Sequence, residues 1–472
     1  MPNIRTLLLI QHIKLHINRL ILILLVIFII NSKDLNAQNL GLIQDAEIEL
    51  NIRKWIEPIF KVANINSKSV KIYIINDNSI NAFVAGGQNI FINTGLILKA
   101  KEVNALIGVL AHEIGHIAGG HLNRTTNSMK DARSTVTIAT IITAGLMAAS
   151  KAAGLKTSGI GKLATLGPVI AERNFYKNSR QNEKYADAAA LKYMLAVRRS
   201  PIPLARLLKG LGKQELLHEN RQDPYLRSHP ISQSRINYLM EGSKNKNIES
   251  FYNSKLDEIK YKRMVAKIIA FTNRPGKTLL LYPKSNQNID AKYARAIAYL
   301  RLPDLDKGIK EINNLINNNN QDPYFPELLG QMLFENGQIY ESIGALQKAA
   351  DILPNNPIIL LSLSRAQIEL SEESENNKAI DNLKNILQNM PENIAAWKLL
   401  SIAEARNNNI GLAQLASAES YYLLGEYELA IKFANKSRIS LIKKSPRDIR
   451  ALDIIFFSKK NINKLRSTEN IK

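Results

Sequence analysis

The chain has 472 residues, which is too long for one ordinary domain and leaves room for two or three. Its apolar content of 45% excludes wholesale disorder, and the absence of cysteine excludes disulfides and every cysteine-ligated metal site. The net charge of +22 suits an anionic partner, but Lys and Arg are scattered and no nucleic-acid-binding motif is present, so a solvated basic surface is the simpler interpretation.

The first 37 residues have the pattern of a signal peptide. Basic residues precede an apolar run, Leu20–Ile30, of 11 residues. A signal-peptide core needs about 7–15 apolar residues, whereas a membrane span needs about 20. Leu35–Ala37 then offers a cleavage site before Gln38. We therefore expect export with removal of residues 1–37, and an uncleaved membrane anchor is the alternative.

Hydrophobic periodicity predicts the elements that follow. An amphipathic helix is expected over 43–63 and a strand over 70–75. A second short strand, 89–93, comes after a turn, and a long helix is expected from about 102 to 122. Helical patterning resumes over 182–217 and continues farther along the chain. These elements predict a mainly α domain with a small β-sheet.

An uncharged segment, residues 134–150, interrupts this pattern. It is 17 residues long and rich in Thr, Ala and Ile. This length is at the lower edge for a membrane span. The segment is interpreted as a mobile lid or a membrane-contacting loop over an active site. A buried core helix and a transmembrane helix are the alternatives.

The last third of the chain contains a repeat of helix pairs. Small residues recur 34 positions apart, as Gly308 and Ser342 do, and as Ala379 and Ala413 do. A polar stretch, Ser371–Asn377, accommodates three extra residues in one unit. The period resembles that of tetratricopeptide repeats, whose stacked helix pairs form a concave surface for a protein partner. The alternative is that the array only supports the first domain.

The chemistry is carried by His112-Glu113-Ile114-Gly115-His116, inside the predicted helix. Residues four positions apart project from the same helix face, so both imidazoles can bind one zinc ion. Glu113 lies beside them and can accept a proton from a water molecule that the metal activates.

The third zinc ligand must come from elsewhere in the chain. One pattern places a histidine six residues after the second zinc-binding histidine, but position 122 is Leu. His121 comes one residue early, and that shift turns the side chain by about 100° on a helix. This pattern is therefore rejected, and His121 is expected to be structural or to support the ligands.

A glutamate on a second helix is the better source. Glu183 and Asp187 are four positions apart and lie on one helix face. Glu183 can bind the metal, while Asp187 holds a ligand histidine through its other ring nitrogen. Two histidines and one glutamate leave a fourth position open, which is the arrangement of a catalytic zinc site.

A third segment, Ser228-His229-Pro230, adds another histidine. His229 can stabilise the oxyanion of the reaction, or it can cap the zinc ion as an extra, inhibitory ligand. The alternative is a histidine that only begins a helix.

These motifs together resemble the zinc metallopeptidase family that includes the CaaX prenyl protease and HtpX. The resemblance rests on His112–His116, on Glu183 with Asp187, and on Ser228–Pro230 with Arg235. A signal peptide followed by tetratricopeptide repeats narrows it to the periplasmic branch of that family. The resemblance covers nearly all of the mature chain.

Residues 81–96 also resemble the segment that precedes the metal helix in this family, and Ala190 departs from it where many relatives have Gly. The resemblance implies an edge strand against which an extended substrate pairs. Its residues are expected to be Ile90, Phe91, Ile92 and Asn93.

The resemblance further implies a periplasmic zinc endopeptidase that binds one Zn²⁺ per chain. It would degrade misfolded or misassembled outer-membrane proteins and assist their assembly machinery, with the repeats binding client or machinery. Zinc would polarise the scissile carbonyl, and Glu113 would pass a proton from water to the leaving amine. Asp187 and His229 complete the expected catalytic set, and Arg235 is expected to support the ligands or the substrate.

The expected fold class is a gluzincin-type metallopeptidase domain followed by an α-solenoid. We place the signal peptide at 1–37, the peptidase domain at 38–265, a linker at 266–288, the repeats at 289–440 and a basic tail at 441–472. A non-enzymatic, chaperone-like binding protein with a closed zinc site is the competing hypothesis. A membrane-embedded protease would need several apolar runs of about 18 or more residues, which are absent.

Overall fold

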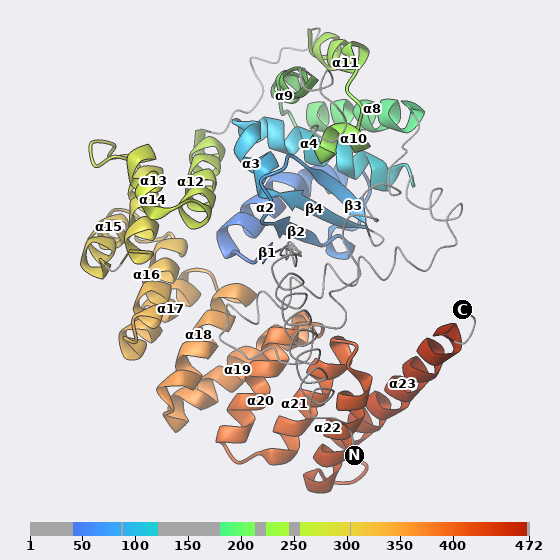
Figure 1. Ribbon diagram of the computed structural model, residues 1–472, viewed down its shortest axis with the longest axis vertical. Coiled ribbons are helices and arrows are strands. Elements are labelled where there is room, and N and C mark those ends of the chain that lie inside the picture. The colour runs from blue at the N-terminus through green and yellow to red at the C-terminus, as the bar shows by residue number, and fades with distance from the viewer. Residues whose placement is uncertain are drawn as a thin grey trace, which may run out of the picture. The chain divides into compact units, whose positions relative to one another are not determined.

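The computed structural model describes six ranges of the chain (Figure 1): 41–85, 88–120, 180–212, 223–244, 255–302 and 304–469. The predicted signal peptide, the apolar segment 134–150 and His121 lie outside the described residues. Leu40–Lys472 forms one compact unit. Among the described residues, no helix is both long and apolar enough to cross a membrane.

The first group of elements combines a small sheet with helices. In chain order it contains β1 (Leu42–Ile43), α2 (Ala46–Val62), the 3-10 turn η1 (Ser67–Ser69), β2 (Ile72–Ile75), β3 (Ala82–Ala85), β4 (Asn89–Asn93), α3 (Thr94–Ala100), α4 (Val103–Ala118), α8 (Arg180–Ala196), α9 (Ile202–Gly212), α10 (Pro224–Ser228) and α11 (Gln233–Lys244).

The second group is entirely helical. It contains α12 (Lys255–Thr272), α13 (Pro275–Leu281), α14 (Ile289–Leu300), α15 (Leu305–Asn318), α16 (Tyr324–Glu335), α17 (Ile339–Ile352), α18 (Pro357–Leu370), α19 (Glu373–Asn389), α20 (Ile394–Arg406), α21 (Ile410–Leu423), α22 (Tyr427–Ser440) and α23 (Pro446–Glu469). The fold class is therefore the predicted one, mainly α with a small β-sheet.

The sheet has four strands in the order β1-β2-β4-β3. β4 pairs in parallel with β2 and antiparallel with β3, so its backbone is hydrogen-bonded on both sides. The prediction that Ile90–Asn93 forms an edge strand is therefore wrong, because an interior strand has no free edge for a substrate. The edge on that side is β3, a strand that the sequence analysis did not predict.

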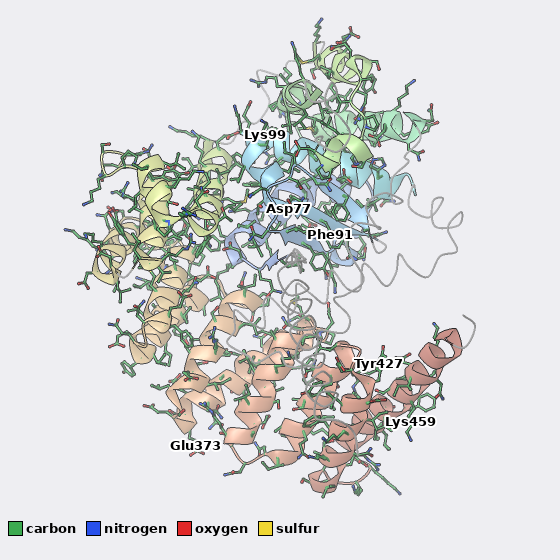
Figure 2. The ribbon with its side chains drawn as sticks, viewed as in Figure 1. Asp77, Phe91, Lys99, Glu373, Tyr427 and Lys459 are labelled. Carbon is green, nitrogen blue, oxygen red and sulfur yellow. The ribbon has the colours of Figure 1, made fainter. Side chains whose placement is uncertain are left out.

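One face of the sheet carries stacked aromatic rings. Phe91 on β4 lies between Tyr73 on β2 and Phe83 on β3, with ring centroids 5.0 Å apart in both pairs. Phe91 is fully buried (Figure 2). Because side chains alternate along a strand, Ile90 and Ile92 point to the opposite face and join the main core.

Helix α4 is the centre of the first core. Every side chain from Val103 to His116 is buried, so this helix is enclosed on all sides rather than amphipathic. It packs against α2, α8, α9 and β3. The helical pattern predicted over 182–217 contains two helices, α8 and α9. The chain turns between them at Arg198, which has a left-handed φ of 56°, and at Pro201.

Two glycines allow close contacts that organise this core. A Cβ added at Gly115 on α4 would lie 3.0 Å from Ala189 Cβ on α8. A Cβ at Gly95 would lie 2.2 Å from the carbonyl oxygen of Asn78. Both positions accept only a residue without a side chain unless the neighbouring backbone moves.

The helix pairs α14/α15, α16/α17, α18/α19 and α20/α21 confirm the predicted repeat. Small residues hold the helices close together, since a Cβ at Gly308 would meet Met332, and one at Gly330 would meet Leu346. The Ser342 hydroxyl donates to Gly330 O at 2.8 Å. The polar stretch that was expected to hold three extra residues ends α18 and begins α19.

The segments predicted to be a linker and a basic tail both contain helices. Residues 266–288 contain the end of α12 and all of α13. Residues 441–472 were expected to form a basic tail, but 446–469 form helix α23, which packs on α22 and α21. The physical reason is that Ala451 and Ile454 bury an apolar face there.

A buried ionic network joins α2 to the helical repeats. Arg263 on α12 pairs with Glu47 on α2 and, at 2.5 Å, with Asp322 before α16. Lys267 Nζ lies 2.6 Å from Asp45 Oδ2, at the N-cap of α2. Nearby Glu327 on α16 has a buried carboxylate oxygen, Oε2, and burial raises the pKa of that carboxyl to about 8.

Candidate metal centre

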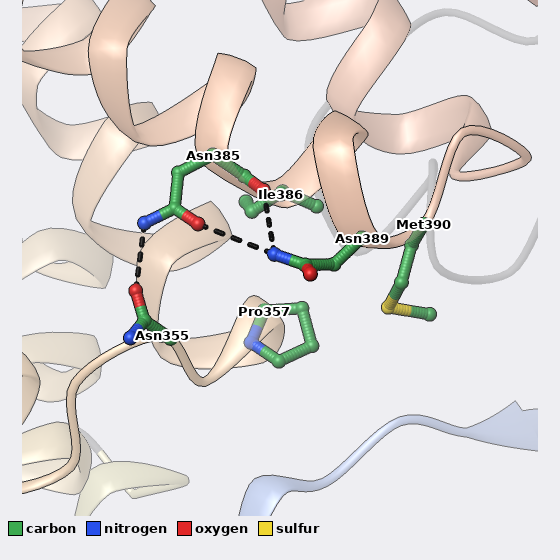
Figure 3. A pocket seen from close by; sticks show the side chains of 6 residues that line it. All are labelled: Asn355, Pro357, Asn385, Ile386, Asn389 and Met390. Carbon is green, nitrogen blue, oxygen red and sulfur yellow. Dashed lines mark hydrogen bonds between the residues drawn. The ribbon is translucent and has the colours of Figure 1, made fainter. Parts of the chain in front are cut away.

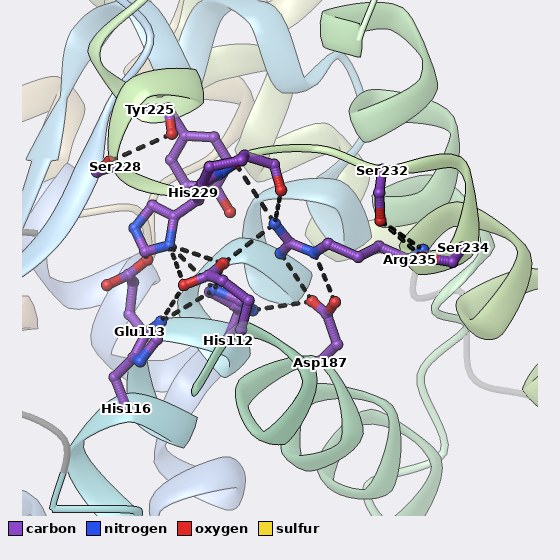
Figure 4. Close-up of polar contacts among 12 residues, drawn as sticks. His112, Glu113, His116, Asp187, Tyr225, Ser228, His229, Ser232, Ser234 and Arg235 are labelled. Carbon is purple, nitrogen blue, oxygen red and sulfur yellow. Dashed lines mark hydrogen bonds and ion pairs between the residues drawn. The ribbon is translucent and has the colours of Figure 1, made fainter. Parts of the chain in front are cut away.

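Four elements bring seven predicted site residues together. Three of them lie on α4 and two on α8. One directly follows α10, and one lies on α11. They are His112, Glu113, His116, Glu183, Asp187, His229 and Arg235 (Figure 4). All seven side chains are buried.

The arrangement of α4 and α8 explains how the ligands meet. His112 and His116 lie on one face of α4, and Glu183 and Asp187 lie on one face of α8. Gly115 and Ala186 let the two helices approach closely at this level. The carboxylates of α8 therefore reach the imidazoles of α4.

The donor atoms have the spacing of ligands around one ion. His112 Nε2 lies 3.1 Å from His116 Nε2, and Glu183 Oε2 and Oε1 lie 3.4 Å from these two nitrogens respectively. Zinc bonds of about 2.0–2.1 Å in a tetrahedron put neighbouring ligand atoms roughly 3.3 Å apart. The nearest donor atoms are therefore spaced as the ligands of one zinc ion are, with a different oxygen of Glu183 facing each histidine.

His229 supplies a fourth donor atom. Its Nδ1 lies 3.3 Å from His112 Nε2 and 3.0 Å from Glu183 Oε1. The ligand atoms of His112, His116, Glu183 and His229 all lie within 4.8 Å of one another. Four donor atoms are the number that four-coordinate zinc requires.

Asp187 and Arg235 hold the ligands in place. Asp187 Oδ1 lies 3.1 Å from His112 Nδ1, so this ring nitrogen can donate while Nε2 keeps its lone pair for a metal. Arg235 donates to both Asp187 oxygens at 2.6 and 2.9 Å and to Pro230 O at 2.8 Å. Its Nη1 also lies 3.0 Å from Glu183 Oε2.

The electrostatics of the ligands follow from burial and from these contacts. Burial disfavours the charged form of His112, but its hydrogen bonds to Asp187 and Glu183 prevail and raise its pKa to about 9. Burial lowers the pKa of His116 to about 3, which keeps this imidazole neutral. The surrounding histidines overcome the effect of burial on Glu183 and hold its pKa below the ordinary value.

Glu113 has a different environment from the ligand carboxylate. Burial raises its pKa above the ordinary value. Its Oε1 is buried, accepts no hydrogen bond from the described residues and lies 3.5 Å from His229 Nε2. A buried carboxylate without a hydrogen-bond donor at this oxygen is suited to accept a proton.

The sequence analysis missed Tyr225, on α10. Its ring lies 4.7 Å from the His229 ring between centroids, and its buried hydroxyl has no hydrogen-bond partner among the described residues. Burial raises its pKa well above the ordinary value, so the hydroxyl keeps its proton and stays a donor. The spacing of four residues between Tyr225 and His229, one helical turn, is the signal that was available.

A separate hollow lies in the repeats and has none of this chemistry. Its volume is about 300 Å³, and its lining side chains are amides and apolar groups (Figure 3), namely Asn355, Pro357, Asn385, Ile386, Asn389 and Met390. Asn385 donates to Asn355 Oδ1 at 2.7 Å across it. Without an ionisable group it offers no acid, base or nucleophile.

The chain resembles known proteins over both of its parts. Residues 45–242 match the sequence profile of peptidase family M48, and residues 312–426 match that of the cytochrome c-type biogenesis protein H TPR domain. The beta-barrel assembly-enhancing protease of Escherichia coli (strain K12) is 24% identical over 385 residues, which are 79% of this chain and 75% of that protein.

Two further relatives agree with this. A putative beta-barrel assembly-enhancing protease of Vibrio cholerae is 26% identical over 76% of this chain and 73% of its own length. The metalloprotease LoiP of Escherichia coli (strain K12) is 30% identical over 38% of this chain and 64% of that protein. The chain thus combines a metallopeptidase domain of family M48 with a tetratricopeptide-repeat domain, and it is homologous to the beta-barrel assembly-enhancing proteases.

Proposed function

We propose that this protein is a zinc-dependent endopeptidase of the gluzincin type. One observation carries the proposal: buried donor atoms of His112, His116 and Glu183 have the spacing of zinc ligands, next to the buried carboxylate of Glu113. A structural zinc site requires the donors but does not require that carboxylate. The match to peptidase family M48 supports the same chemistry.

The residues of the chain divide the work of peptide hydrolysis. Zinc, when bound, supplies a Lewis acid that polarises the scissile carbonyl and lowers the pKa of water. Glu113 accepts the proton of the attacking water and delivers it to the leaving amine. Asp187 keeps His112 in the tautomer that binds metal, and Arg235 keeps Asp187 in place. The protonated hydroxyl of Tyr225 is a candidate donor to the oxyanion.

His229 acts in this proposal as a removable zinc ligand. Its Nδ1 lies 3.0 Å from Glu183 Oε1 and 3.3 Å from His112 Nε2, where a fourth ligand would lie. A site closed in this way has no position for a substrate or a water molecule. His229 must therefore leave before catalysis, which favours the inhibitory role over the oxyanion role that the sequence left open.

The substrate would bind along β3. This strand is the edge of the sheet beside α4, which carries Glu113. An extended peptide can add to such an edge through main-chain hydrogen bonds. β3 thus takes the role that was wrongly assigned to Ile90–Asn93.

The cellular role follows from the leader and the relatives. We infer a periplasmic enzyme that acts on misfolded or misassembled outer-membrane proteins, with the repeats holding client or assembly machinery. The apolar run Leu20–Ile30 with its cleavage site supports export. The names of the homologous proteases support the link to β-barrel assembly.

A binding protein with a closed zinc site is the second candidate, and one observation favours it. His229 completes a four-ligand set, as in structural zinc sites. In that case the repeats would hold a client, as a chaperone does, and Glu113 would have no role.

Zinc content and cleavage of an unfolded protein, measured on residues 38–472, separate the two candidates. The endopeptidase predicts about one zinc per chain, cleavage by the parent, no cleavage by Glu113→Gln and more cleavage by His229→Ala. Glu341→Gln, at an exposed position of α17, is the matched control and should behave as the parent. If His229→Ala binds zinc but cleaves nothing, the binding protein is the better description. A loss of activity in His229→Ala would instead restore the oxyanion role.

A further inference from the structure

The last two helices expose large apolar side chains. We call α22, the connecting residues 441–445 and α23 the C-terminal hairpin. Ile439 and Ile442, at its turn, are 82% and 81% exposed, and Phe456 on α23 is 64% exposed. The exposed large apolar side chains of the hairpin are Leu429, Ile439, Ile442, Ile449, Leu452, Phe456 and Phe457. Such a cluster on a described surface calls for a partner.

The exposed residues of α23 form a face of their own. Ile449, Leu452 and Phe456 are spaced three and four positions apart, so they lie along one side of the helix. Ala451 and Ile454, which point elsewhere, are buried in the contact with α22 and α21. The outer face is therefore not needed to hold the hairpin together.

Positive charge surrounds this apolar face. Between residues 432 and 464 there are ten Lys and Arg against two Asp, a net charge of 10 − 2 = +8. One of the two acids, Asp448, is buried and accepts from Arg438 at 2.6 Å. Five exposed cations lie near the turn or just beyond Phe457, where Figure 2 labels Lys459. They are Lys443, Lys444, Arg447, Lys459 and Lys460. Lys432, Lys436, Arg450 and Lys464 are exposed as well, and Arg450 pairs with Glu419 on α21.

We propose that the C-terminal hairpin binds the surface of an anionic phospholipid bilayer. Ile439, Ile442 and Phe456 enter the boundary between headgroups and acyl chains, while the cations contact lipid phosphates. α23 lies in the plane of the membrane surface, because no described helix is long and apolar enough to cross it. This binding is independent of the metal centre.

The charge argues for lipid over a second copy of the chain. Over the whole hairpin, residues 427–469, the net charge is 11 − 4 = +7. Two hairpins meeting face to face would bring two such charges together, which costs free energy unless an anion lies between them. A bilayer that contains acidic lipids supplies both the negative charge and the apolar interior. Basic side chains close to a membrane surface are attracted to its anionic lipids, and the exposed apolar side chains of the hairpin add burial at the interface.

The test is whether the protein, as residues 38–472, sediments together with lipid vesicles. This range leaves out the apolar run Leu20–Ile30, which would bind lipid by itself. The parent should sediment with vesicles that contain phosphatidylglycerol, less so at high salt, and weakly with pure phosphatidylcholine. Ile439→Ser with Ile442→Ser and Phe456→Ser should weaken binding by about tenfold or more.

A charge variant and two matched controls complete the set. Lys443→Glu with Lys444→Glu should remove the preference for phosphatidylglycerol. Leu280→Ser, which replaces an apolar side chain 82% exposed on α13, should bind as the parent does. Lys310→Glu with Lys348→Glu, at exposed positions of α15 and α17, should keep most of the binding. Circular dichroism checks that each variant is folded.

Insertion is measured separately with Phe456→Trp. Brominated lipid should quench this added tryptophan, because its ring is expected to reach the acyl chains. Three results would overturn the proposal: the parent stays in solution with both kinds of vesicle, the serine variant binds as the parent does, or the tryptophan is not quenched. Self-association that the serine variant abolishes, without lipid binding, would identify the hairpin as an interface between copies.

Discussion

The close contact of α4 with α8 at Gly115 makes a sharp prediction about the metal centre. In Gly115→Ala the new methyl group would lie 3.0 Å from Ala189 Cβ and 3.1 Å from Ala186 O. Carbon atoms in contact normally stay about 3.5–4.0 Å apart. The two helices must therefore separate locally by roughly 0.5 Å or more.

That separation acts directly on the ligands. Ala186 lies one turn from Glu183 on α8, and Gly115 adjoins His116 on α4. Glu183 Oε1 and His116 Nε2 are 3.4 Å apart, near the spacing that one zinc ion requires. Metal distances tolerate only about 0.2 Å. We expect zinc affinity to fall by about 10–100-fold, comparable to the loss of a residue that orients a ligand.

The effect on folding should be much smaller. Replacing Gly by Ala in a helix stabilises it by about 1 kcal/mol, whereas overpacking costs about 1–3 kcal/mol. The free energy of unfolding of the metal-free protein should thus fall by about 0–2 kcal/mol. Gly344→Ala, inside α17 with open space around it, is the matched control. It should be stabilised by about 1 kcal/mol with unchanged zinc affinity.

The assay is a zinc titration against a competing chelator, followed by peptidase activity and urea unfolding without metal. The reasoning is refuted if Gly115→Ala binds zinc and cleaves as well as the parent while gaining the stability of Gly344→Ala. That result would mean that α8 can move away from α4 without displacing Glu183 from the metal centre.

Three further predictions concern stability. Gly95→Ala should lower the free energy of unfolding by at least about 3 kcal/mol in urea, because its methyl group would lie 2.2 and 2.4 Å from the carbonyl oxygens of Asn78 and Ser79. Glu327 has a pKa of about 8 in the folded protein, above its ordinary 4.5, so folding favours the protonated carboxyl. The free energy of unfolding should therefore fall as the pH rises from about 4.5 to 8, by up to about 1.4 kcal/mol per pH unit. Glu327→Gln should flatten that slope in urea titrations, and an unchanged slope would place the carboxyl elsewhere. Chelation should lower the melting temperature of the parent more than that of Glu183→Gln, since only the parent keeps all the buried donors; equal shifts would argue against Glu183 as a ligand.

Much of the metal centre was predictable because it depends on local spacing. His112 and His116 on one helix face follow from the helical repeat alone, as do Glu183 and Asp187 on another. The choice of a carboxylate as the third ligand followed from chemistry, since the chain has no cysteine and position 122 is Leu. The structure brings all four of these residues into contact.

Arg235 shows the limit of local reasoning. Its motif was recognised by resemblance, but its role depends on contacts with Asp187, Glu183 and the carbonyl of Pro230. Tyr225 was missed because the one signal available, its spacing of one helical turn from His229, does not show that its hydroxyl is buried beside a metal centre. In both cases the residue acts through partners that are distant in sequence.

The sequence by itself determined the helix that carries His112 and His116, the ligand pairs and the repeat, because each of these follows from a periodicity within a few tens of residues. Only the tertiary structure decided which strand is the edge of the sheet. Ile90–Asn93 and Ala82–Ala85 are both short and apolar, so local sequence does not distinguish them. Ile90–Asn93 is interior because β4 also pairs with β2, and no local pattern predicts that pairing. The position of His229 as a fourth donor was decided in the same way, since it depends on where α10 packs against α4 and α8. Contacts between distant segments reflect the packing of the whole chain, and that is why periodicity could not predict them.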